Sequence, residues 1–183
     1  MTNIRRIVRK FEGADGAEIA EVALVLPLVF MFLLGIIWFG RAFNIFSTVQ
    51  QAAQQGAIIA ARSTCGLCGD PTNALPNAST VDSAVVAVLA SARLDTGQIK
   101  PWEANNPIPG VQDCPAPAPP HSCTLTGHSI WVCSSVLLNS ATQPPQCGAM
   151  VSFQYKFQAL LPGTSLNMQQ IVLSAQAQSR MEN

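Results

Sequence analysis

Two carboxylates stand where a long apolar run begins, and their placement has a clear chemical consequence. Glu18 lies three residues before Glu21, and nonpolar residues follow Glu21 as far as Gly40. A carboxylate at the centre of a bilayer costs about 2.5–3.5 kcal/mol, and less near an interface. Two explanations are open. The positive amino-terminal end of a helix dipole attracts acids, which suffices for Glu18, whereas Glu21 could also meet a cationic group inside a helical bundle.

Residues 22–40 have the length and composition of a membrane-spanning helix. The segment holds nineteen residues without a charge, and at about 1.5 Å per residue it nearly crosses a hydrocarbon core of about 30 Å. Four basic residues lie within residues 5–10, whereas Arg41 is the only basic residue close behind. This asymmetry predicts a cytoplasmic amino terminus. A cleaved signal peptide is the alternative, but its apolar region has only about 7–15 residues.

The same helix is expected to continue beyond the membrane, from residue 18 to residue 62. After the apolar run, small and apolar residues recur at three- and four-residue steps, which predicts a stripe that needs a partner surface. Glycine and proline within residues 66–71 end the helix. Pro27 cannot donate to the carbonyl of Ala23, so a kink is expected there. The stripe consists of Ala42, Ile45, Phe46, Val49, Ala53, Gly56 and Ala60.

The rest of the chain predicts a small α+β domain. Residues 79–94 indicate a second helix that Ser79 or Thr80 caps. The proline-rich residues 101–123 are typical of an extended surface loop rather than of helix or sheet. One face of the second helix is expected to hold Val81, Val85, Val88 and Leu89.

Three strands are expected in this domain. Apolar and polar residues alternate in residues 151–157 and 171–178, and residues 129–138 form a further candidate. These strands predict an antiparallel sheet packed on the upper part of the long helix. About 120 residues can build only a modest core, so disulfides are expected to reinforce it.

The cysteines all follow the apolar run. An even number on one side of a membrane segment predicts disulfides in an oxidising compartment, with reduced cytosolic thiols as the alternative. Six cysteines allow 15 connectivities, and proximity in the sequence favours bridges between neighbours. The expected pairs, in order, come from Cys65 and Cys68, Cys114 and Cys123, and Cys133 and Cys147.

Two other roles for the cysteines were weighed. Cys65 and Cys68 have the spacing of a redox motif, but that chemistry needs the motif at the start of a helix that follows a strand. A zinc site from Cys65, Cys68, His121 and Cys123 is a further alternative. Its C-x2-C part would supply only half of a ligand set, so no metal site is expected.

Composition and motifs argue against several function classes. Ten basic residues balance ten acidic ones and only 11% of the chain is charged, so no basic face is expected to bind nucleic acid. No acid–base pair, nucleophile constellation or phosphate loop stands out. The sequence therefore predicts neither an enzyme nor a protein that binds a cofactor or a small-molecule substrate. Solvated surface positions are expected for Asp70, Asp82, Asp95, Glu103, Asp113, His121 and His128.

The amino-terminal pattern resembles a known family. A basic leader, Gly16, four residues, Glu21 and an apolar helix form the arrangement of type IV pilin-like precursors. Residues 16–62 are similar to the TadE-like minor pilins of tight-adherence (Flp-type) pilus systems. Residues 148–183 also resemble the tail of that family, which has a strand, a proline-containing turn, a second strand and a closing basic-x-Glu.

The resemblance implies processing by a prepilin peptidase between Gly16 and Ala17, so that Glu21 becomes the fifth mature residue. The new α-amino group of Ala17 could then neutralise Glu21 of a neighbouring subunit. The implied organisation is a cytoplasmic leader (1–16), a transmembrane and stalk helix (17–62) and a periplasmic or extracytoplasmic domain (63–183).

The function that the resemblance implies is that of a minor pilin or pseudopilin. It would be anchored in the bacterial cytoplasmic membrane, and in the pilus if it is incorporated. It would act in assembly of a Tad pilus and in surface attachment, with other pilin subunits and the Tad machinery as partners. The alternative is a single-pass, disulfide-rich periplasmic binding module or adhesin that never enters a filament.

Overall fold

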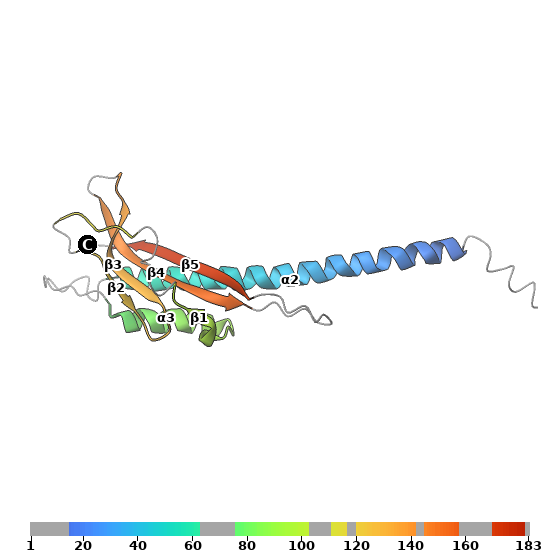
Figure 1. Ribbon diagram of the computed structural model, residues 1–183, viewed down its shortest axis with the longest axis horizontal. Helices are drawn as coiled ribbons and strands as arrows, with labels where there is room; N and C mark the ends of the chain where they lie inside the picture. The colour runs from blue at the N-terminus through green and yellow to red at the C-terminus, as the bar shows by residue number, and fades with distance from the viewer. Residues whose placement is uncertain are drawn as a thin grey trace, which may run out of the picture. The chain divides into compact units, whose positions relative to one another are not determined.

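The computed structural model describes residues 15–62, 76–102, 111–116, 120–141, 145–157 and 170–181, with side chains from Ile19 onward. Within these ranges it confirms an α+β fold with one long helix, a second helix and an antiparallel sheet (Figure 1). The chain divides into two compact units, Met1–Asn44 (the first unit) and Ile45–Asn183 (the second unit). The elements are α2 (Asp15–Ala61), α3 (Ala78–Ser91), the 3-10 turn η1 (Thr96–Gln98), β1 (Ile99–Lys100), β2 (Ser122–Leu125), β3 (Trp131–Asn139), β4 (Gln146–Phe157) and β5 (Ile171–Arg180).

Helix α2 contributes to both units and has 47 residues. The prediction of a single helix over residues 18–62 is confirmed within a few residues at each end. The helix continues through Pro27, and the kink there stays a prediction. At the carboxyl end the Arg62 amide donates to the Ile59 carbonyl at 3.2 Å. The glycine and proline stops at residues 66–71 lie outside the described residues.

The sheet is built around β4. The strand order is β1-β4-β3-β2, and β5 also pairs with β4. The β4 residues that pair with β1 and β3 also pair with β5, so β5 lies along the opposite edge of β4. The β4–β5 ladder has ten register pairs, from Gly148↔Arg180 to Phe157↔Ile171, without a shift. The three expected strands are confirmed as β3, β4 and β5, each within five residues at the start and two at the end of its predicted range.

Helix α3 is confirmed, but its predicted cap is wrong. Asn77 occupies the N-cap position with an extended backbone and no side-chain cap, and its carbonyl accepts from the Thr80 amide at 2.9 Å. The helix begins at Ala78, so Ser79 and Thr80 already lie in its first turn, where they cannot cap. Of the predicted face, Val88 is only partly buried. Val81, Val85 and Leu89 are fully buried.

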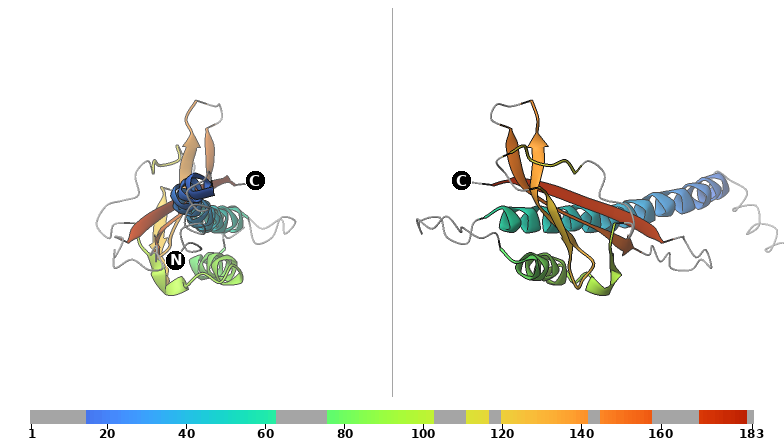
Figure 2. Two further views of the ribbon diagram at one scale, coloured as in Figure 1. Left: turned by 90° about the vertical axis from the view of Figure 1, so that its right-hand side faces the viewer. Right: turned by 60° about the vertical axis from the view of Figure 1, so that its left-hand side comes forward.

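One face of the sheet packs against both helices (Figure 2). Alternate residues of β4 supply this face, because successive strand side chains point to opposite sides. Gly56 of α2 lies where three elements meet: a Cβ on it would stand 2.6 Å from Val85 Cγ2 of α3 and 3.3 Å from Val151 Cγ1 of β4. The absent side chain therefore permits the close approach. The buried residues of β4 on this face are Ala149, Val151, Phe153, Tyr155 and Phe157.

The opposite face of the sheet carries a smaller cluster. Cys133, Val136 and Met150 are buried there, and Val111, Trp131 and Leu138 pack against them. Part of the proline-rich stretch contributes to the sheet edge, since Asp113 bridges Val136 and the Leu137 amide donates to the Gln112 carbonyl at 2.9 Å. The prediction of a loop without sheet pairing is therefore wrong around residues 112–114, and also at residues 122 and 123, which pair with β3 as part of β2. Residues 103–110 and 117–119 lie outside the described part of the chain.

Candidate functional site

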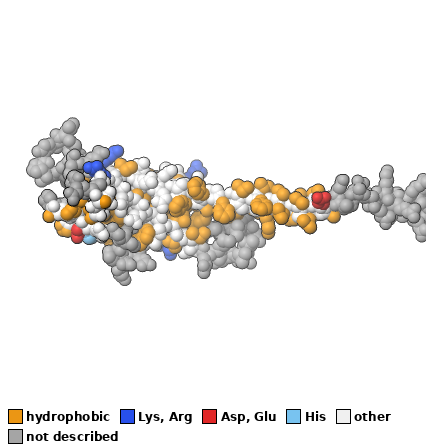
Figure 3. All heavy atoms as spheres, turned by 90° about the horizontal axis from the view of Figure 1, so that it is seen from above, with side chains coloured by type: hydrophobic (Ala, Val, Ile, Leu, Met, Phe, Trp, Pro, Cys, Tyr) orange, Lys and Arg blue, Asp and Glu red, His pale blue; other side chains and the backbone are white. Residues whose placement is uncertain are grey.

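The apolar segment of α2, residues 19–44, carries apolar side chains on all sides of the helix. All its residues are exposed except Gly35, Trp38 and Ala42, which are half-buried. The exposed fraction of its large apolar side chains runs from 46% at Val25 to 80% at Phe39 (Figure 3). A helix that is apolar all round is typical of a protein core or of a membrane span. Its length and composition indicate membrane anchoring.

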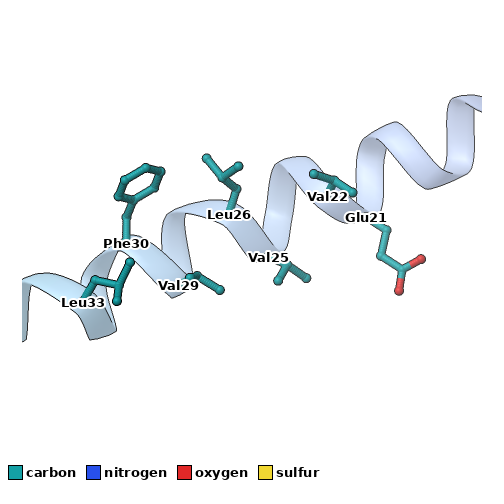
Figure 4. Close-up of a pocket in the computed structure, with 7 residues that line it drawn as sticks. All are labelled: Glu21, Val22, Val25, Leu26, Val29, Phe30 and Leu33. Carbon is teal, nitrogen blue, oxygen red and sulfur yellow. The ribbon is translucent and has the colours of Figure 1, made fainter.

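Glu21 lies at the amino-terminal end of this exposed surface. Its side chain leaves the helix on the same side as Val25, whereas Val22, Leu26 and Phe30 point away from it (Figure 4). These residues line a shallow groove together with Val29 and Leu33, and every wall of it belongs to α2. Glu21 makes no hydrogen bond or ion pair with another described residue. A partner for its carboxylate would therefore have to come from outside the described chain.

The candidate processing site lies in the first turn of α2. The helix begins at Asp15, so the bond between Gly16 and Ala17 is the second one within it. Glu21 follows one turn later on the same helix. The structure thus brings Gly16, Ala17 and Glu21 together on one continuous element.

The packing segment of α2, residues 45–61, contrasts with the apolar segment. Ile45, Val49, Ala53, Gly56 and Ala60 of the predicted stripe are buried. Phe46 is not: it remains 42% exposed, because it lies about 100° around the helix from Ile45. Ala42 is only half-buried. The prediction missed three further buried positions, which are Ala52, Ala57 and Ala61.

The described cysteines form two disulfides, and the pairing of sequence neighbours is wrong for both. Cys123 binds Cys133, since the two residues stand directly opposite each other in β2 and β3. Cys114 binds Cys147, which lies 33 positions further along the sequence, with a Cα–Cα distance of 6.0 Å. Sheet register, rather than sequence proximity, selects these pairs. Cys65 and Cys68 lie outside the described residues.

One residue of the alternative zinc-binding set, Cys123, is not available as a ligand. Cys123 is held in a disulfide, and a disulfide sulfur is not a thiolate ligand. Among the described residues no group of three or more histidines, cysteines or acids is placed to hold a metal ion.

A buried carboxylate links α3 to the turn between β2 and β3, and the sequence analysis missed it. Asp82 was expected to be solvated, but its residue is only 9% exposed. Its carboxylate accepts from Thr126 Oγ1 and lies 2.6 Å from His128 Nδ1. Thr126 Oγ1 in turn accepts from the Ile130 amide at 3.2 Å. These contacts join residues that are 44 and 46 positions apart in the sequence, so no local pattern could have revealed them.

Two exposed aspartates order neighbouring turns. Asp113 accepts from the His121 amide at 2.8 Å and lies 2.6 Å from His121 Nδ1. These contacts, the amide first and then the ring, hold the pKa of the Asp113 carboxyl below its usual value. Hydrogen bonds from the Gln98 side chain and the Gly97 amide likewise lower the pKa of Asp95. Each carboxylate stabilises only the loop in which it lies, so these hydrogen bonds have a structural role.

The described geometry defines a class of protein: one long helix with an exposed apolar segment, followed by a disulfide-bonded α+β unit. Comparison with known proteins refines this class, since residues 16–57 match the family model described as TadE-like protein. The resemblance to TadE-like proteins is thereby confirmed over this segment, which contains Gly16, Ala17, Glu21 and Pro27. No curated protein and no solved structure gives a match to the chain.

Proposed function

We propose that the protein is a membrane-anchored minor pilin or pseudopilin that takes part in assembly of a bacterial Tad pilus and in surface attachment. One observation carries the proposal. A helix exposed on all sides bears a carboxylate, Glu21, five residues beyond Gly16, inside the segment that matches TadE-like proteins. Such a helix needs lipid or other helices around it. The protein has a structural role in this proposal and is not an enzyme.

Orientation follows from the charges around the apolar segment. The basic residues 5–10 keep the leader in the cytoplasm, and residues 63–183 lie on the periplasmic side. Disulfides among the described cysteines agree with an oxidising location. A prepilin peptidase cuts between Gly16 and Ala17 and releases the leader.

Glu21 acts in assembly after this cleavage. The cut creates a positive α-amino group on Ala17, and this amine pairs with Glu21 of an adjacent subunit. Pairing is favourable because each charge would otherwise stand unmatched in a helical bundle of low dielectric constant. The absence of a partner for Glu21 among the described residues supports this assignment.

Mass spectrometry of the mature amino terminus tests the processing step. Wild-type protein should begin at Ala17, and Gly16→Leu should leave the full-length precursor in the membrane, because a side chain at this position obstructs entry into a protease cleft. Gly13→Leu is the matched control and should still be cut. A wild-type protein that keeps its leader, and is found in membranes but not in sheared filaments, would favour the anchored binding module instead.

Variants of the two acids test the assembly step. Glu21→Ala should insert into the membrane and be cut normally but should not support pili, whereas Glu18→Ala should behave like wild type. Membrane content, cleavage and pilus formation are measured together in a strain with all other pilus components. Normal pili from Glu21→Ala would disprove the pairing and leave the helix-dipole explanation. Loss of cleavage would assign Glu21 to peptidase recognition.

A further inference from the structure

One end of the second unit exposes apolar side chains that its own core does not use. Phe46 of α2 is 42% exposed, and Ile171 and Val172 at the start of β5 are 44% and 45% exposed. Of the five exposed large apolar residues described in this unit, these three come from the parts of α2 and β5 at one end of the unit, whereas Ile58 and Leu125 lie elsewhere.

A hydrogen bond fixes the position of Phe46 beside the start of β5. Gln50 Nε2 of α2 donates to the Ser174 carbonyl at 3.1 Å. Phe46 precedes Gln50 by one helical turn, about 6 Å, on the same face of the helix. Val172 precedes Ser174 by two strand residues, about 6.6 Å. Because α2 and β5 run in the same direction (Figure 1), both displacements lead to the same end of the unit.

The same end carries a basic residue without an acidic partner. Lys156↔Val172 and Phe157↔Ile171 are the last two register pairs of the β4–β5 ladder. Directly opposed residues share a face of the sheet, so Lys156 projects beside Val172 on the face turned away from the helices, while Ile171 projects beside Phe157 on the helix-facing side. No ion pair joins Lys156 to a described acid. A cation next to exposed apolar side chains is typical of surfaces that bind anionic membranes.

Chain connectivity places this end close to the membrane. The uncharged run ends at Gly40, and α2 continues as unbroken helix to Phe46. Six residues rise about 9 Å at most above the hydrocarbon core, and any tilt of the helix shortens this distance. The headgroup layer is itself about 5–7 Å thick on each side. Phe46 is therefore at the level of the headgroups or just above them.

We propose that the surface formed by Phe46, Lys156, Ile171 and Val172 docks on the anionic headgroup layer of the membrane that α2 crosses. The apolar side chains enter the boundary between headgroups and acyl chains, and Lys156 meets lipid phosphate. Docking restrains the second unit against the membrane before assembly. The proposal rests on the membrane anchoring proposed above, but not on leader cleavage or on the pairing of Glu21.

Site-specific photo-crosslinking of the full-length protein tests the docking. The residue p-benzoylphenylalanine replaces Val172, and in a matched variant Gln178, which lies on the same face at the other end of β5 and is also exposed. A third variant carries it at Leu26 in the apolar segment. Each protein is reconstituted in nanodiscs that contain phosphatidylglycerol, and adducts are identified by mass. We expect lipid adducts at positions 172 and 26 and none at 178.

Each other result overturns a defined part of the proposal. Adducts at 26 but not at 172 would show an anchored protein whose second unit does not dock. Adducts at neither position would contradict membrane anchoring itself. An adduct at 172 to a second copy of the chain would assign this surface to contact between subunits.

Charge variants identify the lipid chemistry. Lys156→Gln should lower the yield of lipid adducts at position 172 about fivefold in phosphatidylglycerol nanodiscs, because one basic residue contributes this much attraction to an anionic surface. Arg180→Gln, at the opposite end of β5, should leave the yield unchanged. An equal yield from both variants, or an equal yield in pure phosphatidylcholine, would overturn the role of Lys156.

Discussion

The two parts of α2 differ in what surrounds them, although one helix contains both. In the apolar segment (19–44) large side chains are exposed around the whole circumference. In the packing segment (45–61) one stripe is buried, and it is made of small residues except for Ile45 and Val49. The exposed fraction of phenylalanine falls from 80% at Phe39 to 42% at Phe46 along the helix.

The difference shows which segment of α2 packs against other elements of the same chain. Alanine and glycine let the sheet and α3 approach the helix axis, as the contacts around Gly56 show. Bulky side chains on all sides would keep such elements apart, and they match lipid or other apolar helices instead. Size and arrangement of side chains, rather than apolar character alone, separate the two segments.

The largest expected effect comes from removing a buried phenylalanine of the second unit. Phe153 is fully buried on the helix-facing side of β4, and Phe153→Ala should lower the free energy of unfolding by about 4 kcal/mol, since lost burial and a new cavity add together. Phe39→Ala in the apolar segment should leave it unchanged. Denaturant unfolding of the full chain in detergent, followed by near-ultraviolet circular dichroism, measures both. Equal losses would erase the distinction between the segments.

Disulfide removal should follow in size and should affect only the second unit. Replacing Cys114 and Cys147 together by serine should cost about 3.5 kcal/mol, and replacing Cys123 and Cys133 about 2.5 kcal/mol, because the longer loop loses more entropy on closure. The helical signal of the apolar segment should survive reduction. Non-reducing peptide mapping checks the connectivity, and bridges between 114 and 123 or 133 and 147 would contradict it.

Removal of the buried carboxylate should loosen α3 from the sheet. Asp82→Ala leaves the part-buried Thr126 hydroxyl without its acceptor, and an unsatisfied group of this kind costs about 2 kcal/mol. Because α3 covers the packing segment at Gly56, proteolysis should then reach that segment more easily. Asp95→Ala, which alters an exposed turn, serves as the comparison and should change the midpoint of unfolding less. The reverse order would remove Asp82 from this role.

The smallest expected loss of stability comes from adding one methyl group at Gly56. Gly56→Ala places a Cβ within 2.6 Å of Val85 Cγ2. Overpacking costs typically about 1–3 kcal/mol, and the higher helix propensity of alanine offsets about 1 kcal/mol, so a net loss of about 1 kcal/mol is expected. Gly35→Ala meets no atom within 4 Å and should not destabilise. Stabilisation by Gly56→Ala, measured in the same assay, would show that Val85 moves aside without cost.

Local patterns predicted the regular elements well. The uncharged run, the three- and four-residue stripe and the alternation in residues 151–157 each depend on neighbours in the sequence, and each periodicity belongs to one kind of element. Phe46 shows the limit of this reasoning. Its spacing from Ala42 and Val49 fits a stripe, but the width of the buried stripe depends on what packs against it.

The candidate site was accessible to sequence reasoning for a similar reason. Gly16, Ala17 and Glu21 lie within six residues, and an exposed helix keeps them in the order in which the sequence presents them. The surface of Phe46, Lys156, Ile171 and Val172 was not accessible, since its members come from three elements that only the fold assembles.

The sequence by itself determined the membrane-spanning length, the extent of the long helix, three of the five described strands and the presence of an even set of cysteines beyond the apolar run. Tertiary structure alone decided which described cysteines pair, that Asp82 is buried against Thr126 and His128, and that Gly56 lies where α2, α3 and β4 pack closely. The physical reason is the distance along the sequence over which each property is set. Periodicity and hydropathy are set by adjacent residues, whereas pairing, burial and close contact are set by the register of a sheet that joins residues many positions apart.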